Sequence, residues 1–170
     1  MSKIIQIENF SKMKGPFVIC NQENFISTVL FNRNLNVLLV GDLNGNVIQF
    51  KWRNKAWVKQ KDYGNLKIGR IYSCDHYQNI AVFGGNLSSL RFIHMEKMQI
   101  LGDSLQTAVE VIYSIQFCQI TSKIYLILGG RWVSYSRDNT DIFQVSKEFM
   151  ERGSIKSQFY PGRKLFEYKF

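Results

Sequence analysis

Three short apolar segments that end in glycine recur along the chain at nearly constant spacing, and no other feature of the sequence restricts the fold as much. They are residues 37–41, 80–85 and 124–130. Gly84 lies 43 residues after Gly41, and Gly129 lies 45 residues after Gly84. Self-similarity at this period is typical of proteins that stack copies of one supersecondary unit. The sequence therefore predicts three structural repeats.

Each glycine-ended segment has strand-like neighbours. Apolar runs with a small hydroxyl residue precede the three segments at 25–31, 71–74 and 112–117. Polar turns follow Gly41 and Gly84 and lead into third runs at 47–50 and 90–93, whereas the turn after Gly129 departs from this pattern. More polar fourth runs are expected at 56–61, 98–101 and 142–147. Such short runs, in a chain with only two prolines, predict an all-β protein of four-stranded antiparallel units.

The turn after Gly41 has the composition of a tight hairpin. Asn44 and Gly45 both tolerate the positive φ angles that join two antiparallel strands without splaying them. The strands before and after this turn are nearly all apolar, as expected of strands that are covered on both faces. The fourth strand lies at the edge of the sheet, where Lys59 and Lys61 oppose pairing with another chain.

Spacing, strand order and turn glycines together resemble the WD-repeat β-propeller family. Residues 41–51 are similar to that family's glycine, polar turn, glycine and strand, with Phe50-Lys51 in the place of the Trp-Asp dipeptide. Ile93-His94 takes that place in the second unit, and no unit has a clear Gly-His dipeptide before its first strand. The resemblance covers about residues 25–149 and implies β-propeller-type repeats. An unrelated β-sandwich or barrel built from similar hairpins is the alternative.

The resemblance divides the chain into about three four-stranded antiparallel blades, which form a partial propeller. The blade-like repeats are residues 25–64, 65–107 and 108–150. Residues 1–24 are an N-terminal segment in which 3–7 reads as the outer strand of a preceding blade, and residues 151–170 are a basic tail or a degenerate partial blade. Because propellers typically close with four to eight blades, the chain is interpreted first as part of a larger propeller. Self-association and a hidden fourth blade are the alternatives.

Residue patterns that would support catalysis are scarce. His76, expected in a loop, and His94 have no recognisably spaced metal ligands. Cys20, Cys74 and Cys118 are odd in number and widely spaced, which suits neither a disulfide framework nor a zinc site. The glycine patterns of nucleophile elbows, Walker loops and dinucleotide-binding folds do not occur. We therefore expect a protein that is not an enzyme and that has no metal or cofactor.

Charge is the feature that bears on partners. The net charge is +9, and residues 51–67 contain six basic residues against one acidic residue. Aromatic and cationic residues interleave at 51–57, so that the aromatics could stack on bases while the cations meet phosphates. The alternative is a solvated hairpin with Trp57 packed between blades. The candidate partner-binding residues are Lys51, Trp52, Arg53, Lys55, Trp57, Lys59 and Lys61, and the structural turn residues are Gly41, Gly45, Gly84 and Gly129.

The resemblance implies a non-catalytic scaffold that presents loops to protein partners, and the positive charge is compatible with acidic ones. RNA binding through residues 51–67 is the second hypothesis, and an enzyme is the third. No apolar run approaches the roughly 18 residues of a membrane-spanning helix, and the first ten residues lack the continuous apolar core of a signal peptide. We expect a cytoplasmic protein, with the nucleus as the alternative and no membrane association.

Overall fold

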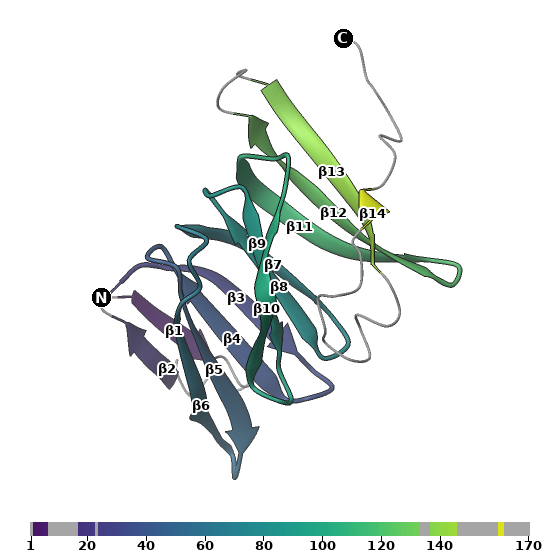
Figure 1. Ribbon diagram of the computed structural model, residues 1–170. Helices are drawn as coiled ribbons and strands as arrows, with labels where there is room; N and C mark the ends of the chain where they lie inside the picture. The colour runs from purple at the N-terminus through teal and green to yellow at the C-terminus, as the bar shows by residue number, and fades with distance from the viewer. Residues whose placement is uncertain (1, 7–16, 23, 133–136, 146–159, 162–170) are drawn as a thin grey trace, which may run out of the picture.

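The computed structural model describes residues 2–6, 17–22, 24–132, 137–145 and 160–161, with side chains described over 24–131 and 140–145. All elements in these ranges are β-strands. They form three four-stranded antiparallel sheets and one two-stranded sheet. The four-stranded sheets follow one another along the chain as neighbouring layers (Figure 1). The prediction of an all-β chain with three four-stranded antiparallel units is confirmed.

In every four-stranded sheet the order of the strands in space is their order along the chain, so each strand pairs with the strand that follows it in the sequence. The first sheet contains β3 (Ile26–Asn32), β4 (Val37–Asp42), β5 (Asn46–Arg53) and β6 (Ala56–Asn65). The second contains β7 (Ile71–Tyr77), β8 (Ile80–Gly85), β9 (Ser89–His94) and β10 (Gln99–Gln106). The third contains β11 (Val111–Ile120), β12 (Lys123–Trp132), β13 (Arg137–Val145) and β14 (Tyr160–Pro161). The strands β1 (Ser2–Gln6) and β2 (Phe17–Gln22) pair with each other.

The third sheet differs from the prediction in its strand order. Residues 142–147 were expected to form the fourth strand, but Ile142–Val145 belong to β13, the third strand, where Ile142 pairs with Ile127 of β12. The fourth place is taken by β14, which comes from the segment 151–170. The third strand could not be predicted from the sequence, because β13 begins with four polar residues and lacks the apolar run that is typical of a buried strand. These residues are Arg137, Asp138, Asn139 and Thr140.

The glycines at the ends of the second strands occupy the same position in the three sheets. Gly41 pairs with Thr28, Gly84 with Ser73 and Gly129 with Ser114. In each first strand the register shifts next to this pair, so that one residue is left unpaired as a β-bulge. The unpaired residues are Ser27, Tyr72 and Tyr113. The small hydroxyl residues Thr28, Ser73 and Ser114 of the first strands are therefore the residues that pair with the three glycines across the strands.

Close approach of the next sheet explains why the first two of these positions are glycine. A Cβ atom on Gly41 would lie 3.3 Å from Cδ1 of Ile71, and one on Gly84 would lie 3.0 Å from Cγ2 of Ile112. We call the space above each glycine, on the side of the following sheet, the glycine seat. In the first two sheets this seat is filled by an isoleucine from the next sheet, so a methyl group at the glycine would press on that isoleucine. At Gly41 it would also come within 2.7 Å of Cγ2 of Thr28 in the same sheet.

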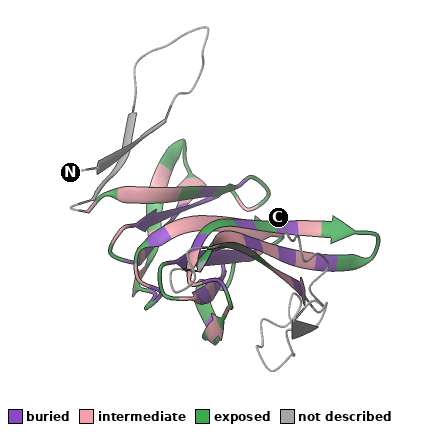
Figure 2. Cartoon of the chain, turned by 90° about the horizontal axis from the view of Figure 1, so that it is seen from above, coloured by how far each residue is buried: buried purple, intermediate pink, exposed green. Residues whose placement is uncertain are grey.

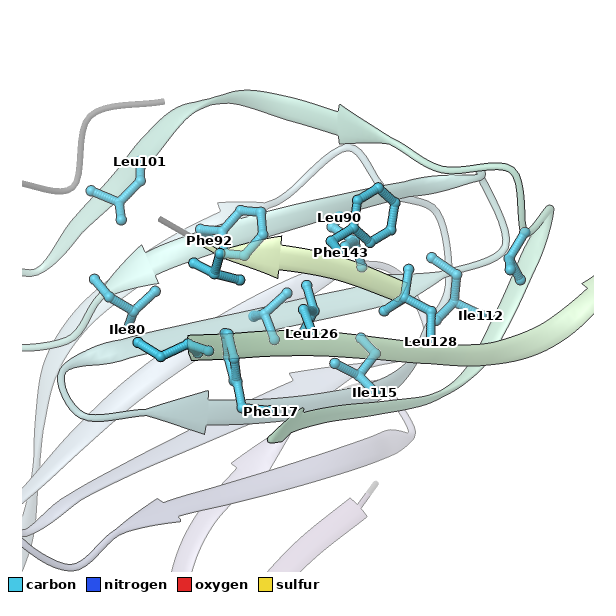
Figure 3. Close-up of a cluster of buried hydrophobic side chains, with 14 residues drawn as sticks. Ile80, Leu90, Phe92, Leu101, Ile112, Ile115, Phe117, Leu126, Leu128 and Phe143 are labelled. Carbon is cyan, nitrogen blue, oxygen red and sulfur yellow. The ribbon is translucent and has the colours of Figure 1, made fainter. Parts of the chain in front are cut away.

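Apolar side chains alternate between the two faces of each sheet and bury the contacts between neighbouring sheets. Val37 and Leu39 of β4 pack with Ala81 and Phe83 of β8 between the first and second sheets. Between the second and third sheets, the buried residues labelled in Figure 3 are Ile80, Leu90, Phe92, Leu101, Ile112, Ile115, Phe117, Leu126, Leu128 and Phe143. The second sheet is thus covered on both faces. Exposed residues lie at strand ends and turns (Figure 2) and along the outer strands β6 and β10.

Hydrogen bonds between first strands also join the sheets. The Asn32 side-chain amide donates to the backbone oxygen of Gln78 at 2.6 Å. The Tyr77 hydroxyl donates to Oε1 of Gln119 at 2.7 Å, in the corresponding positions one sheet further on. These partners are 46 and 42 residues apart in the sequence. The polar contacts therefore repeat with the same period as the strands.

The β4–β5 turn is held by a carboxylate as well as by glycine. Gly45 has a φ of 86°, whereas Asn44 does not adopt a positive φ. Oδ1 of the buried Asp42 accepts hydrogen bonds from the backbone N–H groups of Asn44 at 2.8 Å and Asn46 at 2.9 Å. This turn is therefore longer than the two-residue hairpin that the Asn-Gly pair suggested.

Replacing Gly84 with alanine should destabilise the fold, because the new methyl group would press on Ile112 and Ile115 of the third sheet. We expect the free energy of unfolding to fall by about 1–3 kcal/mol, the usual range for overpacked cores. Ile115→Val removes Cδ1, the atom nearest to the new methyl group, so the double variant should lose less than the sum of the two single variants. Urea denaturation of the three variants measures this coupling, and strictly additive losses would contradict the packing described here.

Candidate partner-binding site

The β5–β6 hairpin carries all the candidate partner-binding residues. Its turn lies between Arg53 and Ala56, which pair with each other, and Asn54 and Lys55 have positive φ angles of 52° and 62°. These angles are those of a two-residue hairpin turn that matches the twist of the strands. The Trp52 N–H donates to the backbone oxygen of Asn36 at 2.9 Å, which brings the β3–β4 and β5–β6 turns to the same end of the first sheet (Figure 1).

The lysines of this hairpin do not share one surface. Lys59 pairs with Phe50 and lies on the outer face of the first sheet, away from the second sheet. Lys61 pairs with Gln49, whose side chain reaches the second sheet, because the register shifts between Gln49 and Phe50. Lys51 pairs with Val58 and lies on the face opposite to Lys59. The structure therefore does not bring Lys51, Lys59 and Lys61 together.

Part of the positive charge is already compensated within the hairpin. Nζ of Lys59 lies 2.9 Å from Oδ2 of Asp62, with both side chains about half exposed. Hydrogen bonds from Lys59 and from the backbone N–H of Gly64 lower the pKa of Asp62 below its usual range. This carboxylate therefore stays ionised beside Lys59, which leaves Arg53 and Lys55 as the exposed cations of the turn.

Aromatic side chains gather on the outer face of the first sheet, at the end that carries this turn. The ring of Trp57 lies 5.4 Å from that of Trp52 and 5.9 Å from that of Phe31, both in edge-on geometry. Trp57 packs on Leu38, Val40 and Phe50 of its own sheet. Its strand pairing directs Trp57 to the face away from the second sheet, so Trp57 does not pack between the first and second sheets.

Two residues join this group that the sequence did not indicate. Phe31, at the end of β3, is 50% exposed and contacts Trp57. Arg33, in the β3–β4 turn, is exposed. We define the turn site as Phe31, Arg33, Trp52, Arg53, Lys55 and Trp57. The site forms because two turns lie close together in space. The alternation of aromatic and basic residues at 51–57 therefore predicted its residues in the β5–β6 hairpin but not Phe31 and Arg33.

Three titratable residues that the sequence singled out, His76, His94 and Cys74, lie in the second sheet. Nδ1 of the buried His94 accepts the Lys97 N–H at 3.2 Å. Burial raises the pKa of Cys74 to about 11, so that its thiol is not ionised near neutral pH. His76 belongs to β7 rather than to a loop, because that strand extends to Tyr77 before the turn. Over residues 24–131 and 140–145, no three His, Cys, Asp or Glu side chains are grouped so as to hold a metal ion.

The described elements also contain no helix that is long and apolar enough to cross a membrane.

Comparison with known proteins supports the fold and leaves the family open. No family model matches the sequence, and no curated protein matches it. The structure is similar to the crystal structure of the computationally designed protein Ika4, a designed β-propeller, with a TM-score of 0.50 and 13% sequence identity over 73% of this chain and 71% of that chain. At this identity the likeness shows the fold alone. The repeated four-stranded antiparallel sheets are those of a β-propeller-type fold.

His94 should make stability depend on pH. Burial lowers the pKa of its imidazole, the positive charge of Lys97 acts in the same direction, and Glu96 opposes them. The unfolded chain takes up this proton near pH 6.5 while the folded chain resists it, so the free energy of unfolding should fall as the pH drops below about 6.5.

The variant His94→Asn keeps an acceptor for the Lys97 N–H near the position of Nδ1 but does not titrate. In urea denaturation its stability should change less between about pH 7 and about pH 5 than that of the native chain. An equal change in both chains would assign the pH dependence to other groups.

Proposed function

We propose that this chain is a non-catalytic interaction scaffold of the WD-repeat type that binds an acidic protein segment at the turn site. The observation that supports the proposal is the contact of Trp57 with Phe31 and Trp52 at the end of the first sheet whose two turns carry the exposed Arg33, Arg53 and Lys55. Trp and Arg are among the residues that contribute most to protein interfaces. Cations beside aromatic surface attract carboxylates while the rings supply apolar contact.

The arrangement of charge favours a protein segment over nucleic acid. A protein that tracks a phosphate backbone needs a continuous positive groove. Here Lys51 and Lys61 lie on the opposite face from Lys59, and Lys59 is paired with Asp62. Three cations at two turns suit a short acidic peptide. The WD-repeat assignment rests on the strand period and the turn glycines, and it favours a protein of the cytoplasm or nucleus that assembles other proteins.

Charge reversal at the turn tests this proposal. The double variant Arg53→Glu/Lys55→Glu should bind a fluorescent peptide of aspartate, glutamate and leucine at least tenfold more weakly than the native chain, a loss of about 1.4 kcal/mol or more. The matched control is Lys67→Glu/Arg70→Glu, which makes the same charge change at two exposed residues between β6 and β7. Fluorescence anisotropy measures both affinities, and circular dichroism checks the fold.

The control variant should bind the peptide nearly as well as the native chain. Equal losses in both double variants would show that only the net charge matters and would contradict a site at the turn. A tight, salt-sensitive complex with RNA that is lost in Arg53→Glu/Lys55→Glu, with no peptide binding, would instead favour the nucleic-acid hypothesis.

A further inference from the structure

The β4–β5 turn contains the only Asn-Gly pair in the sequence, Asn44-Gly45. Asparagine deamidates fastest before glycine, because glycine has no side chain to hinder attack by its own backbone nitrogen. Asn44 is exposed, so water reaches its side chain, whereas Gly45 is buried. Because the strands of the first sheet are antiparallel, this turn lies at the opposite end of that sheet from the turn site. The first sheet therefore carries a chemically reactive pair of residues outside the turn site.

Deamidation replaces the side-chain amide of asparagine with a carboxylate in two steps. The backbone nitrogen of Gly45 forms a bond to Cγ of Asn44, the Cγ–Nδ2 bond breaks, and ammonia leaves with the proton of the Gly45 nitrogen. Water then opens the five-membered imide at one of its two carbonyls, which returns a proton to that nitrogen and leaves aspartate or isoaspartate. The first step requires the peptide group between Asn44 and Gly45 to rotate until its nitrogen faces Cγ.

Hydrogen bonds hold this peptide group at both of its polar atoms. The Gly45 N–H donates to the backbone oxygen of Asp42 at 3.2 Å, and Nδ2 of Asn65 donates to the backbone oxygen of Asn44 at 2.5 Å. On the other side of the same Cα, the Asn44 N–H donates to Oδ1 of Asp42 at 2.8 Å. The Leu66 N–H donates to the backbone oxygen of Gly45 at 2.8 Å. The attacking nitrogen can therefore reach Cγ only after several of these bonds break together.

We propose that Asn44 is a deamidation site that is blocked while the β4–β5 turn is closed, reacts when the turn opens, and leaves a turn that does not close again. Isoaspartate adds one carbon to the main chain between residues 44 and 45. The turn has no room for a longer chain, since even a Cβ on Gly45 would lie 2.6 Å from the backbone oxygen of Gly69. The new carboxylate also lies two residues from the buried carboxylate of Asp42.

The modification acts on the contact between the first two sheets. The closed turn is tied to the segment between β6 and β7 through Asn65 and Leu66. Leu66 and Ile68 of that segment are buried in the apolar cluster between the first and second sheets. Loss of the closed turn therefore loosens the segment that seals one end of this cluster, and each deamidated chain keeps a permanent record that its turn has opened.

Mass spectrometry of the tryptic peptide 34–51 measures the reaction in the full chain, because trypsin cleaves after Arg33 and Lys51. The reference is a synthetic peptide of the same residues, in which nothing holds the turn. Asn44 should deamidate about tenfold or more slowly in the folded chain than in this peptide, since only the open fraction of the turn reacts. Equal rates in the chain and the peptide would overturn the proposal.

Variants of Asn65 identify the hydrogen bond that blocks the reaction. Asn65 is exposed, and Asn65→Ala removes its bond to Asn44, so deamidation should become several-fold faster than in the native chain. Asn65→Asp still offers an acceptor to the Lys67 N–H but has no donor for Asn44, and it should also react faster. The matched control is Asn79→Ala, which removes an amide hydrogen bond to Glu96 in the second sheet and should react as the native chain does.

Native rates in both Asn65 variants would overturn the role of the closed turn. Equal acceleration in Asn65→Ala and Asn79→Ala would also contradict it, because the reaction would then follow the stability of the whole fold.

The product tests whether the turn closes again. In the isoaspartate form, separated by chromatography, hydrogen–deuterium exchange of the Asn46 and Leu66 amides should be several-fold faster than in the native chain. These amides donate to Asp42 and Gly45 in the closed turn. An isoaspartate form with native exchange at both amides would overturn the proposal that the turn stays open.

Discussion

Contact between a glycine of one sheet and an isoleucine of the next fixes how closely the sheets of this protein approach. Ile71 lies over Gly41 and Ile112 lies over Gly84. In each first strand the isoleucine comes directly before the β-bulge, which locally alters the course of the strand. Close approach then lets the alternating apolar residues of neighbouring sheets bury one another.

The sequence predicted the parts of the fold in which this glycine–isoleucine contact recurs. The spacing of Gly41, Gly84 and Gly129 reflects one interface used several times, so the period was visible without any family signature. The third strand of the third sheet was missed because its first four residues are polar and its pairing comes from tertiary context. His76 was misplaced for a similar reason, since the polar end of β7 reads as a loop although it pairs with β8.

The candidate site was only partly predictable, because register and chain proximity decide it. Interleaved aromatic and basic residues identified Trp52, Arg53, Lys55 and Trp57, but the shift of register in β6 separates Lys61 from Lys59. No sequence pattern places Phe31 beside Trp57, since they lie 26 residues apart on the first and fourth strands. A hydrogen bond from the Trp52 N–H to the backbone oxygen of Asn36 joins the two turns that form the site.

In a stack of sheets, contacts form only between adjacent units. A sheet that packs against two neighbours should therefore resist local unfolding better than a sheet that packs against one. Hydrogen–deuterium exchange of backbone amides tests this most directly. The account predicts that amides of β8, in the sheet covered on both faces, exchange more slowly than those of β4 and β12. Exchange in β8 as fast as in β4 and β12 would contradict a fold held together by contacts between sheets.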